Sequence, residues 1–244
     1  MFSPAVDAAA KGHALAEYPK ECCGVVAGTK ETAAYVPLPN VAANPEEEFE
    51  LPRTALIEHA PVLGVIHSHC FPKHGAAPTA LDMQFQLQAG LPYGIVWTDG
   101  KAAGVPLWFG DFLLDVPLFD AKGNHVAREF MHGVTDCYSL IRAWFWQARK
   151  IKLPDFPRDQ DWWKRGGDLY RDGIGKAGFH EISPAMAGPG DVVFLKWGKW
   201  PVPYHAGVLV ENGLILHHLD RKLSRREPFA RWTHYVTHYL RRDG

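Results

Sequence analysis

Two histidines and an aspartate have the spacing of metal ligands in the first third of the sequence. His67 and His69 lie two residues apart at the end of an apolar run, and Asp82 follows in the first turn of a predicted helix. Side chains two apart on a strand share one face, so both imidazoles emerge together. Two histidines, one carboxylate and an open fourth position form a ligand set of catalytic zinc. The spacing therefore predicts a zinc site, although two polar residues at a strand edge would look the same.

Glu21 and Thr79 could supply the other groups that metal-assisted peptide hydrolysis needs. Glu21 precedes a predicted strand, and a glutamate that is not a ligand could take a proton from water and deliver it to the leaving amine. Thr79 lies three residues before Asp82, so its hydroxyl could cap the helix or stabilise an oxyanion. His74, in the loop between the histidines and Thr79, could compete for the metal, but an exposed loop residue is the simpler interpretation.

A cysteine and two histidines form a second candidate site. Cys137 begins an apolar helical segment, where the helix dipole and unpaired backbone N–H groups favour a thiolate. His205 begins an alternating strand and could act as the base. Antiparallel pairing across a turn at 211–213 would bring His217 beside His205, where it could fix the base's tautomer. An ordinary buried cysteine is the alternative for Cys137. His218 competes for the role of His217, but strand alternation points it to the opposite face.

Hydrophobic periodicity predicts the elements that position these residues. In the first half we expect three helices, over 3–17, 53–60 and 79–89, and five strands, over 23–28, 32–38, 63–69, 93–98 and 103–109. Residues 111–130 lose this regularity. In the second half we expect a helix over 137–150, further helix with glycine breaks over 161–178, and strands over 190–197, 204–211, 213–219 and 232–240.

Composition is that of an ordinary globular protein of one large or two smaller domains. The 244 residues are 47% hydrophobic and 22% charged, which argues against disorder, collagen and coiled coil. No apolar run approaches the roughly 18–20 residues of a membrane span, and the N-terminus lacks the pattern of a secretory signal. The four cysteines form no C-x-x-C pair, which argues against a zinc ribbon, a thioredoxin motif or a disulfide framework.

The net charge of −1 conceals an asymmetry. Residues 1–115 carry 6 basic and 13 acidic side chains, whereas residues 116–244 carry 20 and 14. This contrast predicts two domains, 1–115 and 131–244, joined by a linker at 116–130. Seven Lys and Arg lie between 221 and 242, either as a solvated face or as a contact for an anionic partner such as cell-wall polymer. Nothing else in the sequence supports nucleic-acid binding.

The order of the first set of residues resembles the JAMM (MPN-type) metallopeptidases. That family has a Glu before its second strand, then His-Ser-His, then Ser-x-x-Asp at a helix start; here these correspond to PKECCGVVAG (19–28), His67-Ser68-His69 and APTALD (77–82). The resemblance implies an α/β sandwich of the cytidine-deaminase-like type and a zinc-dependent peptidase. Thr79 replaces the family's Ser. The loop before it is about two residues longer and includes Cys70, where a Pro is common.

The second set resembles the NlpC/P60 cysteine peptidases, which cut peptides of peptidoglycan. The segments GVTDCYSLIRAWF (133–145), PGDVVFLKW (189–197) and YHAGVLVENGLILHH (204–218) occur in the family's order. The resemblance implies a papain-like α+β domain with Cys137 as nucleophile, His205 as base and His217 as orienting residue, without a cofactor. Tyr138 and Ser139 replace the usual Ser-Gly, and the bulkier Tyr138 could change which substrate fits.

The two motif sets in one chain resemble the tail assembly protein K family of lambda-like phages. The resemblance implies a virion protein of the tail tip, assembled in the host cytoplasm with other tail-tip and hub proteins. Its cysteine peptidase would cut peptidoglycan stem peptides, at γ-D-glutamyl–diamino-acid bonds, in the periplasm during host entry. Two alternatives remain open. One is a structural tail component with one or both sites inactive; the other is a cellular JAMM peptidase that trims a ubiquitin-like or sulfur-carrier protein.

Overall fold

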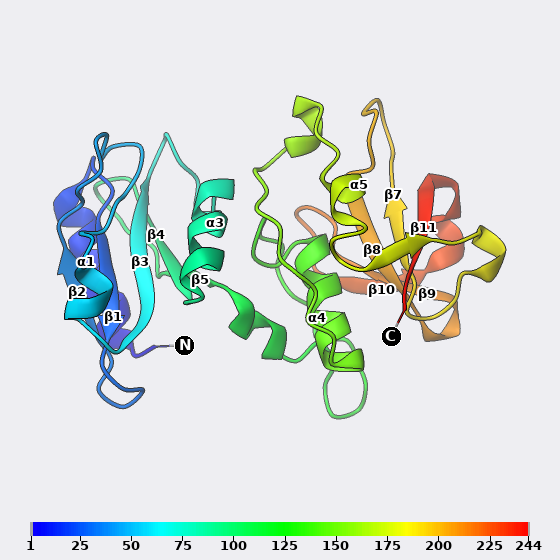
Figure 1. The fold of residues 1–244 in the computed structure, drawn as a ribbon, viewed down its shortest axis with the longest axis horizontal. Helices are drawn as coiled ribbons and strands as arrows, with labels where there is room; N and C mark the ends of the chain where they lie inside the picture. Colours follow the sequence, from blue (N-terminus) through cyan, green and yellow to red (C-terminus); the bar gives the residue numbers. More distant parts are fainter. Residues whose placement is uncertain (1, 244) are drawn as a thin grey trace. The chain divides into compact units, whose positions relative to one another are not determined.

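The computed structural model describes residues 2–243 and divides into two compact units. The first contains the chain up to Pro78 together with Gln84–Phe112; the second contains Thr79–Met83 and the chain from Leu113 onward. Each unit combines helices with one β-sheet (Figure 1), as the mixed α+β fold predicted from the sequence requires. Among the described residues, no helix is both long and apolar enough to cross a bilayer.

The first sheet brings the two histidines next to the helix that carries Asp82. Its strand order is β2-β1-β3-β4-β5, and only β3 and β4 run parallel. Parallel neighbours need a crossover connection, which α3 provides, so the carboxyl end of β3 leads into the start of α3. The elements are α1 (Pro4–Glu17), β1 (Cys23–Ala27), β2 (Ala34–Leu38), α2 (Ala55–Glu58), β3 (Val62–Cys70), α3 (Ala80–Ala89), β4 (Tyr93–Thr98) and β5 (Leu107–Phe109).

Helix α1 fixes the sheet from one side. Val6, Ala10 and Ala14 recur every four residues, share one helix face and are fully buried. Their small side chains allow close approach to the sheet, where they cluster with Ile66 of β3 and Val96 of β4. Because Ile66 is adjacent to His67, this packing also holds the histidine-bearing end of β3.

The second sheet is antiparallel throughout, in the order β10-β9-β8-β7-β11-β6. Helix α4 (Cys137–Arg149) packs its apolar face, including Leu140, Ile141 and Phe145, into one core with β7, β8 and β9. The remaining elements are α5 (Leu169–Gly173), β6 (Phe179–Glu181), β7 (Val192–Leu195), β8 (His205–Val210), β9 (Leu214–His217), β10 (Arg225–Pro228), β11 (Val236–Arg242) and short 3-10 turns.

Several expected elements are shorter than predicted. Residues 161–178 form only a 3-10 turn and α5, because glycines interrupt the segment, with Gly166 at φ 83°. The expected strand at 103–109 is reduced to β5, since Pro106 cannot donate to a ladder. Residues 229–235 form 3-10 turns rather than the start of the last strand, and they pack Trp232 and Tyr235 against the sheet. Strands β6 and β10 were not predicted.

Residues 113–130 have no regular strand or helix beyond a 3-10 turn, and they pack within the second unit. Leu114 and Leu118 are buried in its core, and His125 donates to or accepts from the hydroxyl of Ser224 at 2.9 Å. The division into 1–115, a linker at 116–130 and 131–244 remains our proposal for the domain organisation.

Candidate functional sites

His67, His69 and Asp82 come together as the sequence predicts. All three are buried, and their ligand atoms lie within 4.8 Å of one another. The Nε2 atoms of His67 and His69 are 3.2 Å apart. A tetrahedral metal with bonds of about 2.0–2.1 Å to nitrogen separates its ligand atoms by about 3.3 Å, so the two imidazoles are compatible with one shared ion.

Neighbouring groups orient these ligands toward a common point. The Nδ1 atom of His69 lies 2.7 Å from the carbonyl oxygen of Gly75. Since a carbonyl only accepts, Nδ1 carries the proton and Nε2 keeps the lone pair that a metal requires. Asp82 accepts hydrogen bonds from the backbone N–H and the hydroxyl of Thr79 at its Oδ2, both at 2.7 Å. Thr79 therefore holds Asp82 as part of a helix cap, in which the Thr79 hydroxyl also accepts from the backbone N–H of Asp82.

The register of β1 against β3 brings the backbone of Glu21 near the histidine-bearing end of β3. Strand β1 pairs antiparallel with β3, with Cys23 opposite His67 and a backbone bond from Ser68 to the carbonyl of Cys22. Continued by two residues, this register places the backbone of Glu21 level with His69, and the Glu21 side chain is buried. The role of Glu21 as a proton carrier stays a proposal.

Two polar residues of the longer loop after His69 make contacts next to the candidate ligands. The ring of His74 lies against that of His69, with centroids 5.5 Å apart, and His74 faces Glu47 at 3.4 Å, but it is not one of the three clustered ligands. Cys70 donates to the carbonyl of Lys20 at 3.4 Å, and burial raises the pKa of its thiol to about 11. Cys22 and Cys23 are buried beside the strand, as expected of core residues.

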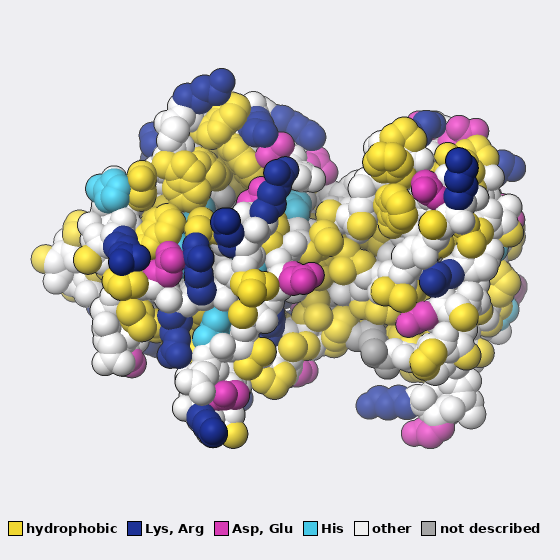
Figure 2. All heavy atoms as spheres, turned by 180° about the vertical axis from the view of Figure 1, so that it is seen from behind, with side chains coloured by type: hydrophobic (Ala, Val, Ile, Leu, Met, Phe, Trp, Pro, Cys, Tyr) yellow, Lys and Arg dark blue, Asp and Glu magenta, His cyan; other side chains and the backbone are white. Residues whose placement is uncertain are grey.

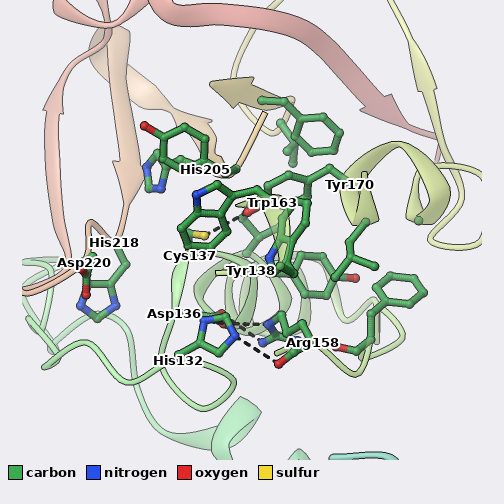
Figure 3. A pocket seen from close by; sticks show the side chains of 18 of the residues that line it. His132, Asp136, Cys137, Tyr138, Arg158, Trp163, Tyr170, His205, His218 and Asp220 are labelled. Carbon is green, nitrogen blue, oxygen red and sulfur yellow. Dashed lines mark hydrogen bonds and ion pairs between the residues drawn. The ribbon is translucent and has the colours of Figure 1, made fainter. Parts of the chain in front are cut away.

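Cys137 and His205 line the same cleft in the second unit. The cleft encloses about 300 Å³ and is walled mainly by apolar and aromatic side chains (Figure 3). Cys137 is the first residue of α4, and His205 is the first residue of β8. The backbone N–H of Ala206, next to His205, hydrogen-bonds the sulfur and lowers its pKa. The structure therefore places the predicted nucleophile and base at one opening.

The free thiol is protonated rather than preformed as a thiolate. Burial raises the pKa of Cys137 to about 11, and the charge of Asp136 adds to this effect. The hydroxyl of Tyr170 lies 3.0 Å from the sulfur and acts in the opposite direction. The favourable helix terminus expected from the sequence is thus outweighed by desolvation, so a base must take the proton during attack.

His205 and His217 form a hydrogen-bonded pair. Gly207 pairs directly with His217, and His205 lies two residues earlier on the same face. The Nε2 atom of His205 is 3.1 Å from Nδ1 of His217, whose Nε2 is 3.1 Å from Glu227. Burial, together with repulsion from His217, holds the pKa of His205 well below its usual value. His205 is therefore neutral at pH 7 and able to accept a proton.

His217, not His218, is the partner of the proposed base. The Nε2 atom of His218 lies 3.0 Å from the carbonyl of Lys222, and its ring packs edge-on against Phe130. The imidazole of His218 nevertheless lines the cleft, where it lies apart from His205 (Figure 3). Strand alternation therefore identifies the histidine that hydrogen-bonds His205, and the orienting role of His217 stays a prediction.

An ion-pair network holds the start of α4. Arg158 is buried and donates to both oxygens of Asp136, at 2.7 and 3.0 Å, and to Asp155 at 2.8 Å. Asp136 also caps α4 by accepting from the backbone N–H of Ser139. Burial alone would raise the pKa of Asp136, but the charge and hydrogen bonds of Arg158 outweigh it and lower that pKa below its usual range.

The sequence did not predict three residues that contact members of the cysteine site or its helix cap: Tyr170, Arg158 and Glu227. Each reaches its partner from a distant segment, 33, 22 and 10 residues away. The only local signal was the pair of opposite charges, Arg225 and Glu227, on an alternating segment just after His217. That signal is too common to single out a site.

Comparison with known families finds two matches that divide the chain. Residues 4–109 match the prokaryotic homologs of the JAB domain, and residues 123–242 match the NlpC/P60 family. The first match contains the three candidate metal ligands with Glu21 and Thr79. The second contains Cys137, His205 and His217.

Two phage proteins resemble the chain over most of its length. Tail tip assembly protein K of Escherichia phage N15 is 33% identical over 227 residues, which is 89% of this chain and 86% of that protein. The protein of the same name from Escherichia phage lambda is 34% identical over 181 residues, or 73% and 80% of the two chains. A probable TtuB-protein conjugate cleaving protease from Thermus thermophilus is 35% identical over 101 residues, 38% of this chain and 66% of that one.

Proposed function

The chain belongs to the tail tip assembly protein K family, and on that premise we propose that it is a phage tail-tip protein with a cysteine endopeptidase in its second unit. The observation that carries the proposal is the cleft shared by Cys137 and His205, with His217 hydrogen-bonded behind the base. Its substrate is the peptide stem of peptidoglycan, cut at the γ-D-glutamyl–diamino-acid bond. The protein acts with other tail-tip and hub proteins, at the cell wall of the host.

The proposed reaction follows from the protonation states in the cleft. Neutral His205 takes the proton of Cys137 as the sulfur attacks the peptide carbonyl carbon. Backbone N–H groups near the start of α4 stabilise the oxyanion. His205 then returns the proton to the leaving amine as the C–N bond breaks, which leaves a thioester. Water, deprotonated by His205, attacks the thioester, the C–S bond breaks, and the sulfur recovers the proton.

For residues 4–109, the span that matches the JAB domain, we propose a zinc-dependent peptidase site. His67, His69 and Asp82 would hold the ion, and Thr79 would keep Asp82 in place. A zinc ion bound there would supply Lewis-acid chemistry. Glu21 would hold a proton at its carboxylate and pass it from water to the leaving amine. The support is the donor set, its burial and the family match.

The peptidase proposal is tested on purified peptide stems, with products followed by mass spectrometry. We expect the wild type to cleave the γ-D-glutamyl–diamino-acid bond, Cys137→Ala to lose cleavage, and His67→Ala to retain it. A folded wild-type protein that cleaves no stem would contradict the proposal. So would a Cys137→Ala protein that cleaves as fast as the wild type.

The zinc proposal is tested by metal analysis of the purified chain. We expect close to one bound zinc per chain, and loss of that zinc in the His67→Ala/His69→Ala protein. Cys137→Ala is the matched control and should keep its zinc, because its thiol is not one of the clustered ligands. Equal zinc contents in the wild type and the double variant would refute the site.

A structural tail component with idle sites is the second candidate. The protonated, buried thiol of Cys137 is the observation that favours it. In that case phages carrying Cys137→Ala would assemble tails and infect as efficiently as the wild type, whereas the peptidase proposal predicts fewer productive infections.

A further inference from the structure

A carboxylate lies behind the two histidines of the cysteine site. Glu227, on β10, pairs with Ile215 of β9 and therefore shares a sheet face with His217. We propose that Glu227 is a fourth member of the site, a positioning residue that sets the tautomer of His217 and, through it, that of His205. The inference rests on the proposed cysteine peptidase function.

Two hydrogen-bond donors and one cation surround the Glu227 carboxylate. Its Oε2 lies 3.1 Å from Nε2 of His217 and 3.1 Å from the indole nitrogen of Trp232. Its Oε1 lies 3.0 Å from Nε of Arg225, an ion pair in which this Nε makes no hydrogen bond. An indole nitrogen can only donate and an ionised carboxylate can only accept, so both contacts of Oε2 are ones in which Glu227 accepts.

This arrangement determines which group donates in the hydrogen bond between Glu227 and His217 and in the one between His217 and His205. Because Glu227 accepts, His217 carries its proton on Nε2 and has a lone pair on Nδ1. The bond between the two rings then requires His205 to donate from Nε2. His205 is left with its lone pair on Nδ1, which is the nitrogen able to take the Cys137 proton. One carboxylate thus selects the catalytically competent form of a ring with which it has no contact.

Glu227 also supports the charge that develops during attack. When His205 gains the Cys137 proton, both of its nitrogens become donors, and Nδ1 of His217 still accepts from one of them. The negative carboxylate on the far side of His217 stabilises this imidazolium through the chain. Arg225 neutralises Glu227 only from its other oxygen.

Glu227→Gln tests this arrangement because an amide offers one acceptor and one donor group. If the NH₂ group faces His217 and Trp232, it meets the indole N–H, and His217 must move its proton to Nδ1; His205 then carries its proton on Nδ1 and cannot serve as base. If the NH₂ group faces Arg225 instead, it lies against the guanidinium cation. Arg225→Gln removes that cation and supplies an amide oxygen that can accept from the NH₂ group, so the amide oxygen at position 227 can accept from His217 and Trp232 again.

The experiment compares Glu227→Gln, Arg225→Gln and the double variant in the full-length protein. We expect Glu227→Gln to lower kcat by roughly 10²–10⁴-fold with little change in KM, as wrong-tautomer variants of other triads do. Arg225→Gln should change kcat by less than about threefold. The double variant should recover at least about tenfold over Glu227→Gln. Glu211→Gln, exposed in the β8–β9 turn, is the matched control and should match the wild type.

A second readout does not depend on activity. Nitrogen chemical shifts of labelled histidines report which ring nitrogen carries the proton. We expect Nε2–H for both His205 and His217 in the wild type, and Nδ1–H for both in Glu227→Gln. Unchanged tautomers and unchanged kcat in Glu227→Gln would overturn the inference. A wild type that cleaves no stem would instead defeat the proposed function, while the chemical shifts would still decide the role of Glu227.

Discussion

The reactivity of Cys137 depends on neighbouring groups that change the pKa of its thiol in opposite directions. Burial and the neighbouring Asp136 raise the pKa of the thiol to about 11, whereas the hydroxyl of Tyr170 and the N–H of Ala206 lower it. The phenol of Tyr170 is itself held in place by stacking on Phe194, with ring centroids 4.5 Å apart. The hydroxyl of Tyr170 is therefore held in a position from which it can donate a hydrogen bond to the thiolate.

We predict that Tyr170→Phe slows alkylation of Cys137 by iodoacetamide roughly tenfold at pH 8. The variant loses a hydrogen bond to a charged sulfur, worth about 1.5–3 kcal/mol, so the thiolate becomes rarer. Rates are measured by mass spectrometry of the labelled Cys137 peptide. Tyr138→Phe is the control, since its hydroxyl donates to the carbonyl of Pro154 and not to the thiol. Faster labelling of Tyr170→Phe would show that Tyr170 merely shields the sulfur.

At the scale of elements, the first turn of α4 depends on one buried cation. Arg158 joins Asp136 to Asp155 and also donates to the hydroxyl of Ser139. These contacts connect an irregular segment to the helix that presents Cys137. A neutral side chain at 158 would leave Asp136 buried without its counter-charge.

We predict that Arg158→Met lowers the free energy of unfolding by about 3–5 kcal/mol, because breaking a buried ion pair leaves an uncompensated charge. Denaturant unfolding followed by tryptophan fluorescence measures the change. Arg165→Met is the matched control: that arginine is 68% exposed and pairs with Asp159 at the surface, so less than about 1 kcal/mol should be lost. Similar losses in the two variants would contradict the importance of the buried network.

The sequence predicts contacts that follow from strand and helix periodicity. Alternation places His67 beside His69, helix capping places Thr79 on Asp82, and hairpin pairing places His217 near His205. Each of these contacts lies within one element or across one turn, so local periodicity is enough to predict it. The elements themselves were predictable where they are long and regular, as in α1, β3 and α4.

Contacts that depend on packing between distant elements were not predictable. Glu227 reaches His217 only because β10 pairs with β9 in a particular register, and β10 was not expected. Arg158 lies in a segment without regular structure, so no periodicity points to Asp136. Burial reversed the expected effect of the helix terminus on the Cys137 pKa, because desolvation depends on the complete fold.

For the whole molecule, the main contrast between the two halves of the chain is their net charge: residues 1–115 are acidic and residues 116–244 are basic. Binding of a polyanion by the basic C-terminal half would require its Lys and Arg side chains to form a continuous surface. On the face shown in Figure 2, however, Lys and Arg side chains lie singly among apolar and acidic ones rather than in one continuous patch. This arrangement fits a solvated surface on that face better than a polyanion-binding track.

Buried histidines make the stability of the second unit depend on pH. Burial lowers the pKa of His217 to about 4, against the opposing effect of the hydrogen bond that His217 donates to Glu227. The pKa values of His205 and His218 are also lowered, chiefly by burial; charge repulsion from His217 and His218 adds to this for His205, and Asp136 opposes it for both. Asp136 itself has a lowered pKa, so its contribution to stability is lost only below the unfolded value near 3.9.

We therefore predict that the second unit loses stability as the pH falls from about 6.5 to 4. In this window the unfolded chain binds protons that the folded histidines do not, so the free energy of unfolding falls by up to about 1.4 kcal/mol per pH unit for each such histidine. Urea unfolding by tryptophan fluorescence measures this slope, since seven of the nine tryptophans lie after residue 113. His217→Asn should flatten the slope by about one proton, whereas exposed His234→Asn should not. A wild-type free energy of unfolding that is constant from pH 6.5 to 4 would mean that these histidines take up protons as readily in the fold as in the unfolded chain, which would contradict the lowering of their pKa values by burial.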